Sequence, residues 1–242
     1  MKATNLLESH FLQPYMLCLN LGVNPKVFRS MKLSKGLLMA NRYYLEFNDQ
    51  DREEIKKNLA MLEREMNVPL NYLDLAKSQS ESELSFIGVE ASAKSIEYRF
   101  YFNFDEKQEL RNAFAIHWIK GAEKAFLKSY DELYLDDVNQ IFESLDKNPQ
   151  RDKEFSLYAT KILSKKGISN KVFKVQEEAT GRLSYDVSIP HLIFEEIAAT
   201  LREISAYCKV SEQFKKWFNS VDKRRSLARF AVGVSDSFFI TV

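Results

Sequence analysis

The sequence has little glycine and little cysteine. Seven glycines are spread over 242 residues, and none forms a loop of the kind that cradles phosphate groups or a dinucleotide. Cys18 and Cys208 have no metal-like or CxxC spacing, so we expect two reduced, buried thiols, as in a cytoplasmic protein. The three histidines are not spaced as ligands, and the sequence predicts no metal site built from protein side chains alone.

The sequence also lacks an excess of charge and a long apolar run. Its 35 basic and 34 acidic residues leave a formal net charge of +1, which argues against nucleic acid or an anionic membrane as a partner. Any anion site must therefore be local. The longest apolar stretches fall well short of the roughly 20 residues of a membrane span. Because Glu8 and His10 interrupt the apolar pattern of the N-terminal segment, we expect no signal peptide there.

Strict alternation of polar and apolar residues is the strongest pattern present. In residues 95–102, Ile96, Tyr98, Phe100 and Phe102 share one face, while serine, glutamate, arginine and tyrosine side chains share the other. Period two is typical of a β-strand. The polar face of such a strand can meet bulk water, or it can line a closed barrel whose apolar side packs on helices.

Pairs of such strands recur, and most are followed by a segment of helical spacing. Strands are predicted at residues 27–32, 37–47, 84–90, 94–104, 155–162, 171–176, 183–189, 229–234 and 238–242. Helices are predicted at residues 5–16, 49–66, 105–125, 131–145, 190–204 and 211–221, the second of them capped by Asn48 or Asp49.

Short turns between consecutive strands make those strands antiparallel neighbours. An open antiparallel sheet with helices on its apolar face would fit the pattern. A closed antiparallel barrel with a polar lumen and an outer ring of helices is favoured, because closure removes sheet edges and explains charges of both signs on one face. The sequence thus predicts an α+β fold and one domain over residues 1–242.

Four short stretches of the chain are similar to a known family. They are residues 38–47, residues 86–90 with 95–102, residues 183–187, and residues 230–234 with 238–242. With the repeated strand–strand–helix order, they resemble the ABBA prenyltransferases, and among these the cyanobactin-type peptide prenyltransferases.

The resemblance implies an enzyme that transfers an isoprenyl group, dimethylallyl or geranyl, from its diphosphate to a side chain of a peptide. The co-substrate would be the isoprenyl diphosphate, with Mg²⁺ as a candidate cofactor, and the peptide would be macrocyclic. Prenylation of an arginine guanidine, prenylation of Tyr or Trp, and a non-catalytic barrel that binds a hydrophobic ligand remain alternatives.

Such a site needs donors for a diphosphate and aromatic faces around an allylic cation. The candidates on the predicted inner face are Arg42, Arg99, Lys174, Arg229, Tyr44, Tyr101 and Tyr158. Each basic residue alone is more typical of an exposed strand charge. Four on one face predict a convergent anion site.

Acidic residues on the same face are the candidates for acceptor chemistry. The family's usual acceptor-activating glutamate lies upstream of the arginine that matches Arg42, but residues 24–30 contain no acid. Glu46, Glu97 and Asp186 take its place as predicted catalytic residues. Carboxylates bind guanidinium groups well, so they favour an arginine acceptor; simple ion pairing with the neighbouring arginines is the alternative.

Overall fold

The structure is a computed structural model of residues 1–242. It describes residues 3–72, 83–92, 95–103, 113–134, 153–163, 171–177, 180–181, 183–188, 192–222, 224, 227, 229–233 and 237–242. The elements are α1 (Ala3–Asn20), β1 (Lys26–Ser34), β2 (Leu37–Glu46), α2 (Asp49–Glu65), β3 (Leu84–Ala91), β4 (Ile96–Phe102), β5 (Ala113–Ile119), β6 (Ala125–Tyr134), α5 (Lys153–Leu163), β7 (Lys171–Glu177), β8 (Leu183–Ser188), η1 (Phe194–Ile197), α6 (Ala198–Tyr207), α7 (Ser211–Asn219), β9 (Arg229–Gly233) and β10 (Ser237–Thr241).

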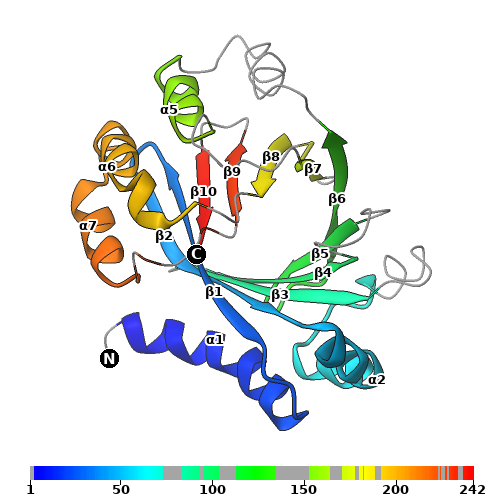
Figure 1. Cartoon of the computed structure of the whole chain (residues 1–242). Helices are drawn as coiled ribbons and strands as arrows, with labels where there is room; N and C mark the ends of the chain where they lie inside the picture. The colour runs from blue at the N-terminus through cyan, green and yellow to red at the C-terminus, as the bar shows by residue number, and fades with distance from the viewer. Residues whose placement is uncertain are drawn as a thin grey trace. The chain divides into compact units, whose positions relative to one another are not determined.

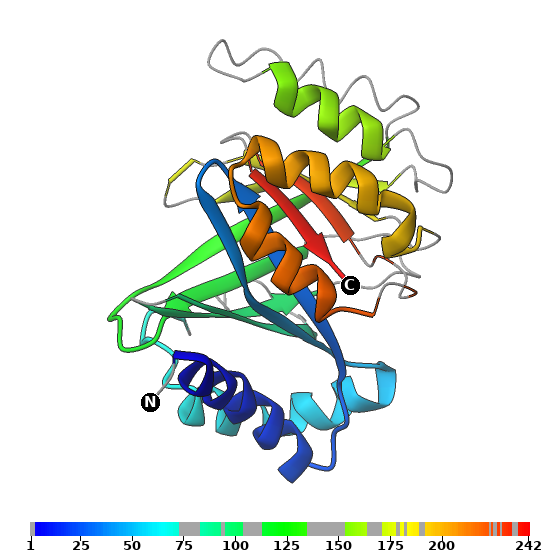
Figure 2. The same ribbon diagram turned by 90° about the vertical axis from the view of Figure 1, so that its left-hand side faces the viewer.

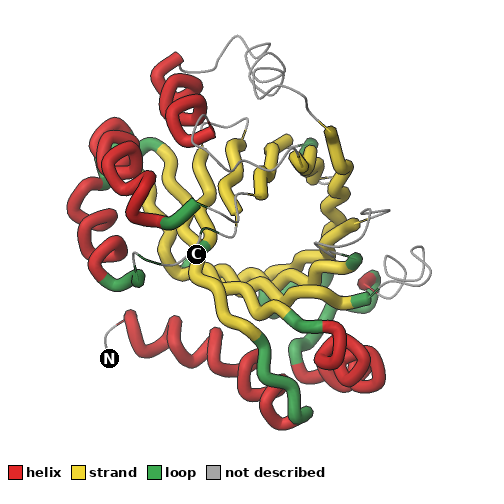
Figure 3. The backbone as a smooth tube through the Cα atoms, viewed as in Figure 1, coloured by secondary structure: helices red, strands yellow, loops and turns green. Residues whose placement is uncertain are grey.

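The ten strands that the structure describes close into a barrel in the order β1-β10-β9-β8-β7-β6-β5-β4-β3-β2. The pairings whose register is resolved are antiparallel. Figure 3 draws these strands in yellow and the helices in red. The predicted α+β fold, an antiparallel barrel with helices outside it, is confirmed.

The chain forms two compact units. Unit 1 comprises residues 1–29, 41–130 and 177–181, and unit 2 comprises residues 30–40, 131–176 and 182–242. Several strands pass from one unit to the other, so no single point of the sequence separates them.

In unit 1, α1 and α2 cover one face of the strands (Figure 1). Asn48 caps α2 by accepting a hydrogen bond from the backbone N–H of Asp51, as the sequence predicted. The buried stripe of α2, which includes Ile55 and Leu62, packs on the apolar face of β3, β4 and β5. The largest side chain of this core is Trp118, whose ring lies 5.0 Å from that of Phe100.

In unit 2, η1, α6 and α7 cover β8, β9 and β10 (Figure 2). The amphipathic helix α7 inserts Phe214, Trp217 and Phe218 into this core, where Phe230 and Phe238 of the paired strands β9 and β10 also lie. The helix α5 runs beside α6, and Lys161 reaches Glu203 at 2.7 Å.

Two predicted helices are wrong where the structure describes them. The helix predicted over residues 105–125 is replaced by β5 and the start of β6, with residues 104–112 outside the described part. Of the helix predicted over residues 131–145, residues 131–134 belong to β6 and the rest lies outside the described residues. The run from Ala113 to Trp118 is buried on both faces and apolar except for His117, so it lacks the alternation that identifies a half-solvated strand.

The strand predicted over residues 155–162 is also wrong, because this segment is the helix α5. Ala159 and Ile162, three residues apart, are buried, while Leu157 is exposed. That spacing is typical of a helix. The packing of α5 against α6 favours the helix over the strand that the short alternating pattern predicted.

Both cysteines are free and buried, and burial raises the pKa of the Cys18 thiol to about 12. Within the described residues, none of the helices has the length and apolar character needed to cross a bilayer.

Candidate functional site

The strands of unit 1 bring polar side chains together on the face opposite α1 and α2, called here the polar face. In the register of the sheet, Arg42 of β2 lies opposite Glu90 of β3, and Glu90 lies opposite Glu97 of β4. Arg99 of β4 lies opposite His117 of β5. The neighbours of Arg99 along β4, Tyr98 and Phe100, lie in the helix-packed core instead. The predicted orientation of β2 and β4 is therefore confirmed.

Basic and acidic side chains alternate across this face in one continuous chain. In spatial order they are Arg42, Glu90, Arg99, Glu97, His117, Glu177 and Lys128. All of them belong to unit 1.

The Arg42 end of the chain is almost fully buried. Oε2 of Glu90 lies 2.9 Å from Nε of Arg42 and 2.6 Å from Nη2 of Arg99. The Arg99 side chain also donates through Nε to Oε1 of Glu97 at 2.8 Å. Two buried guanidinium groups thus share one carboxylate, which is the kind of paired arrangement that buried charges require.

The other end runs through His117. Its Nδ1 lies 2.8 Å from Oε1 of Glu97, and its Nε2 lies 3.3 Å from Oε1 of Glu177. The same Glu177 oxygen is 3.2 Å from Nζ of Lys128, and Thr180 donates a hydrogen bond to the other oxygen. Glu97 is therefore coupled to both Arg99 and His117.

The pKa values of the carboxyl groups reflect these partners. Burial alone would raise the pKa of Glu90, but the charges of Arg42 and Arg99 outweigh it and lower the pKa to about 2. Burial is likewise outweighed at Glu97, where Arg99 and the hydrogen bond from His117 hold the pKa far below its usual range. Both acids are charged at neutral pH.

We expect these ion pairs to make the free energy of unfolding fall as the pH is lowered. A carboxyl group with a depressed folded-state pKa stabilises the fold above its unfolded pKa, and this stability is lost as the pH falls through the folded pKa. For Glu90 the window runs from about pH 4.5 down to about 2, and its full contribution is about 3 kcal/mol.

Urea denaturation between pH 7 and pH 3 checks this expectation. Wild-type protein should lose more free energy of unfolding over that interval than Glu90→Gln, whereas Glu54→Gln, on the exposed side of α2, should follow wild type. Equal losses in wild type and Glu90→Gln would show that the Glu90 pairing contributes nothing to stability.

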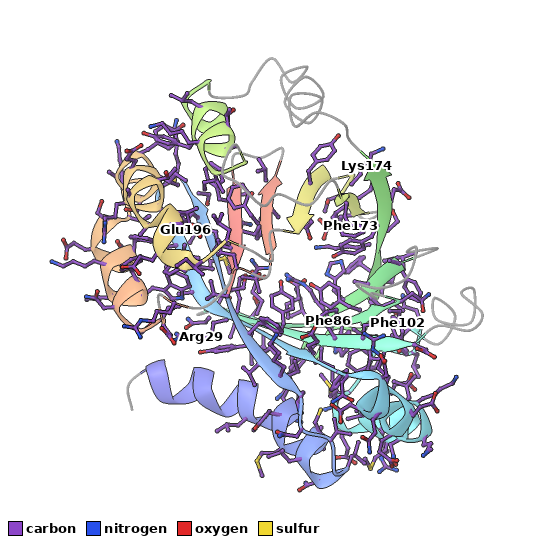
Figure 4. All side chains as sticks on the ribbon, in the orientation of Figure 1. Arg29, Phe86, Phe102, Phe173, Lys174 and Glu196 are labelled. Atoms are coloured by element: carbon purple, nitrogen blue, oxygen red, sulfur yellow. The ribbon has the colours of Figure 1, made fainter. Side chains whose placement is uncertain are left out.

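Tyrosine rings lie beside the two arginines. Arg42 donates from Nη2 to the Tyr44 hydroxyl at 3.0 Å, and the hydroxyls of Tyr44 and Tyr101 are hydrogen-bonded to each other. The Tyr101 ring is 5.7 Å from that of Tyr44, 6.2 Å from that of Tyr130 and 6.3 Å from that of Phe86, which Figure 4 labels. The polar face thus offers cations and aromatic faces side by side.

The electrostatic environments of the two hydroxyls differ. Burial would raise the pKa of Tyr44, but Arg42 and Arg99 outweigh it, so this pKa is lowered. Burial and the neighbouring Tyr44 raise the pKa of Tyr101 well above its ordinary value. Tyr101 is therefore the donor in the hydrogen bond between the two hydroxyls, and Tyr44 accepts it.

Gly88 makes room for this pair of rings. It lies on β3 opposite Tyr44 and Arg99, and a Cβ there would come within 3.0 Å of Cε2 of Tyr101 and 3.3 Å of Cε1 of Tyr44. We expect Gly88→Ala to push the rings apart and to lower the free energy of unfolding by about 1–3 kcal/mol.

A double-mutant cycle measured by urea denaturation checks this expectation. In a Tyr101→Ala background the contact at 3.0 Å is removed, so most of the cost of Gly88→Ala should disappear, although the added methyl group still meets Cε1 of Tyr44 at 3.3 Å. A cost that persists in full would mean that the Tyr101 ring is not what resists the substitution.

Three further predicted site residues lie on β2, β8 and β9. Glu46 is on β2, and its Oε2 lies 3.8 Å from Nζ of the exposed Lys26. Asp186 is in unit 2, on the face of β8 opposite the helix-packed Tyr185. Arg229 pairs with Thr241 in the register of β9 and β10, but its side chain is outside the described part.

Two predicted orientations are wrong. Lys174 pairs with Tyr185, which packs in the helix-covered core of unit 2, so Lys174 lies on the helix side of β7 and Phe173 on the other side (Figure 4). Tyr158 is on α5, where its ring lies 5.7 Å from that of Tyr207 on α6. Its assignment to a strand face has no basis in the structure.

Glu90, Lys128 and Glu177 were not among the residues predicted from the sequence, and His117 was not singled out. Glu90 lies on the polar face of β3, but the residues two and four positions before it on that face are Gly88 and Phe86, so the sequence shows no polar face in this strand. Glu177 directly follows the predicted strand 171–176 and meets His117 only through long-range packing. Within the described residues, no group of three or more His, Cys, Asp or Glu side chains could hold a metal ion.

A comparison with solved structures adds to this geometry. Residues covering 90% of this chain align with 77% of AnaPT from Neosartorya fischeri, an ABBA prenyltransferase, at a TM-score of 0.60 and 14% sequence identity. The chain has the ABBA prenyltransferase fold. No protein-family model and no curated protein matches its sequence.

Proposed function

We propose that the protein transfers an isoprenyl group from its diphosphate to an acceptor. The observation that carries the proposal is the pair of buried guanidinium groups, Arg42 and Arg99, beside the tyrosines of the polar face. Guanidinium groups form charge-assisted bonds to diphosphate oxygens, and the tyrosine hydroxyls add donors. The ABBA fold is the framework in which we place this chemistry.

In this proposal the C1–O bond of the isoprenyl diphosphate breaks, and its electron pair leaves with the diphosphate. The charges of Arg42 and Arg99 stabilise the departing anion. Tyr44, Tyr101 and Tyr130 present aromatic faces to the allylic cation and keep water away from it. A nucleophilic atom of the acceptor then bonds to C1 and loses a proton.

The proton released by the acceptor goes to the imidazole of His117. Oε1 of Glu97 faces Nδ1 of His117 at 2.8 Å, so this carboxylate, whose pKa is held far below its usual range, stabilises the imidazolium that forms and does not itself keep the proton. Deprotonation accompanies bond formation, because a carboxylate beside a guanidinium acceptor favours the charged form before attack.

The acceptor in our proposal is a peptide, macrocyclic as in the cyanobactin-type enzymes, that presents an arginine. Its guanidinium offers five N–H donors and a positive charge. We assign the contact with this guanidinium to Glu97, while Glu46 and Asp186 remain predicted contributors. The isoprenyl diphosphate is the co-substrate, and Mg²⁺ stays a candidate cofactor.

Incubating the protein with cyclic peptides and an isoprenyl diphosphate tests the proposal. Dimethylallyl and geranyl diphosphates, each with and without Mg²⁺, are combined with peptides that differ only in one arginine, tyrosine or tryptophan. Mass spectrometry should show one added isoprenyl group on the arginine peptide, in preference to the other two.

The other outcomes discriminate between the alternatives. Modification of the tyrosine or tryptophan peptide alone would show that the acids of the polar face serve only as partners of Arg42 and Arg99. If no peptide is modified while the protein binds a non-hydrolysable thiolodiphosphate, a non-catalytic binding barrel would explain the result better.

A further inference from the structure

The carboxylate of Glu90 lies between two buried guanidinium groups. A single oxygen, Oε2, faces Nε of Arg42 at 2.9 Å and Nη2 of Arg99 at 2.6 Å. The Glu90 side chain is 13% exposed, and the two arginine side chains are 5% and 10% exposed. An oxygen shared by two desolvated guanidinium groups is the contact that a diphosphate oxygen would make in the proposed function.

Each arginine is also held from a second side. The Tyr44 hydroxyl accepts a hydrogen bond from Nη2 of Arg42, and Glu97 accepts one from Nε of Arg99. Glu90, in contrast, contacts both guanidinium groups through the same oxygen. It therefore supplies negative charge between them, while Tyr44 and Glu97 hold their outer ends.

We infer that Glu90 is a resident anion: it holds Arg42 and Arg99 in place when the site is empty, and it competes with the diphosphate of the substrate for them. This inference rests on the proposed function. It assigns a role to a residue that touches the arginines and not the reacting carbon, so Glu90 is a positioning residue.

Competition from Glu90 has a consequence for turnover. Tight binding that is equal for substrate and product diphosphate does not speed the reaction, and it delays release of the product. A fixed negative charge beside the anion weakens both interactions equally. Product pyrophosphate would then leave more readily, at the expense of a higher Kd for the donor.

A purely structural role for Glu90 leads to the opposite expectation. If Glu90 only orients the arginines, removing its charge would let them move, and anion binding would weaken. If Glu90 competes, removing its charge would strengthen anion binding. The sign of the change in affinity therefore separates the two roles.

Isothermal titration of inorganic pyrophosphate measures this sign. The variant Glu90→Gln keeps a carbonyl oxygen that can accept the hydrogen bond from Nη2 of Arg99 and lie beside Nε of Arg42, but it carries no charge. We expect it to bind pyrophosphate about tenfold more tightly than wild type at the same pH and salt concentration. Glu123→Gln, an exposed acid of unit 1, should stay within about twofold of wild type.

Thermal unfolding provides a second readout. Pyrophosphate should raise the Tm of Glu90→Gln more than that of wild type, because the added anion replaces the missing one. If Glu90→Gln does not fold without an anion, Glu90→Asp keeps the charge but withdraws it from the guanidinium groups. We expect Glu90→Asp to bind pyrophosphate at least about threefold more tightly than wild type.

The failures of the inference and of the proposed function are distinguishable. If wild type binds pyrophosphate and the folded Glu90 variants bind it equally or more weakly, the inference is overturned and the proposed function stands. If neither wild type nor any Glu90 variant binds pyrophosphate, the diphosphate site and the inference are both wrong. Binding by the variants alone would support the inference, since Glu90 would then block the site.

Discussion

Arg99→Ala should lower the free energy of unfolding by about 3–5 kcal/mol and should weaken binding of the isoprenyl donor at least about 30-fold. Arg99 is buried, and it contacts both Glu90 and Glu97. Removing the guanidinium would leave two carboxylates together in a site with little water. That cost exceeds the energy of the lost contacts, because among the described residues Glu90 would keep only its ion pair with Arg42, and Glu97 would keep its contact with His117.

The loss of donor binding has a separate cause. In the proposed function the Arg99 guanidinium gives a charge-assisted contact to the diphosphate, which is worth about 2–3 kcal/mol. After its removal, the two acids would also repel the anion. Urea denaturation measures the first effect, and titration with a thiolodiphosphate analogue measures the second.

Lys26→Ala is the control for Arg99→Ala. Lys26 belongs to the same unit and approaches Glu46 at 3.8 Å, but its side chain is 71% exposed, so its removal should cost less than about 1 kcal/mol. If Arg99→Ala unfolds no more easily than Lys26→Ala, the buried chain of charges does not stabilise unit 1. If it is destabilised but binds the donor normally, Arg99 is structural only.

The sequence predicted the polar face of unit 1 best where the strands alternate strictly. Arg42, Tyr44, Arg99 and Tyr101 lie on the predicted face because the two faces of β2 and β4 meet different environments. A shift of one residue in the register of either strand would have put charged side chains into the apolar core, so the face on which each side chain lies is strongly determined.

Prediction failed where both faces of a strand are buried. The inner face of β5 carries Ala113 and Ala115 beside His117, and the outer face carries Phe114, Ile116 and Trp118. Because the whole run is apolar except for one histidine, its period is not visible. Because the segment was predicted as a helix, the position of His117 on the polar face could not be predicted either.

The other wrong predictions, for Tyr158 and Lys174, concern residues whose positions depend on contacts with distant parts of the chain. In α5, the alternation that suggested a strand for Tyr158 has no bearing on the packing against α6, which the local sequence does not encode. Lys174 was assigned to the polar side of β7, but its cross-strand partner Tyr185 lies in the helix-covered core. Cross-strand partners decide such cases, and a single sequence does not reveal them.

Glu97→Gln should reduce turnover about 100-fold and should not weaken donor binding. The substituted amide keeps an oxygen that can accept hydrogen bonds from Arg99 Nε and His117 Nδ1, so the geometry around Arg99 is retained. It has no negative charge with which to attract a guanidinium acceptor or to stabilise His117 after His117 has taken the acceptor's proton. General-base catalysis typically contributes about 100-fold or more, which sets the size of the expected loss.

Steady-state kinetics with the arginine peptide, together with titration of the thiolodiphosphate, separates these two effects. The loss should appear in kcat and in the KM for the peptide, while the Kd of the donor analogue stays equal to that of wild type or falls. Glu123→Gln, an exposed acid away from the polar face, should match wild type in all three quantities. Turnover by Glu97→Gln within about threefold of wild type would show that Glu97 serves Arg99 and His117 alone and that the acceptor's proton leaves by another route.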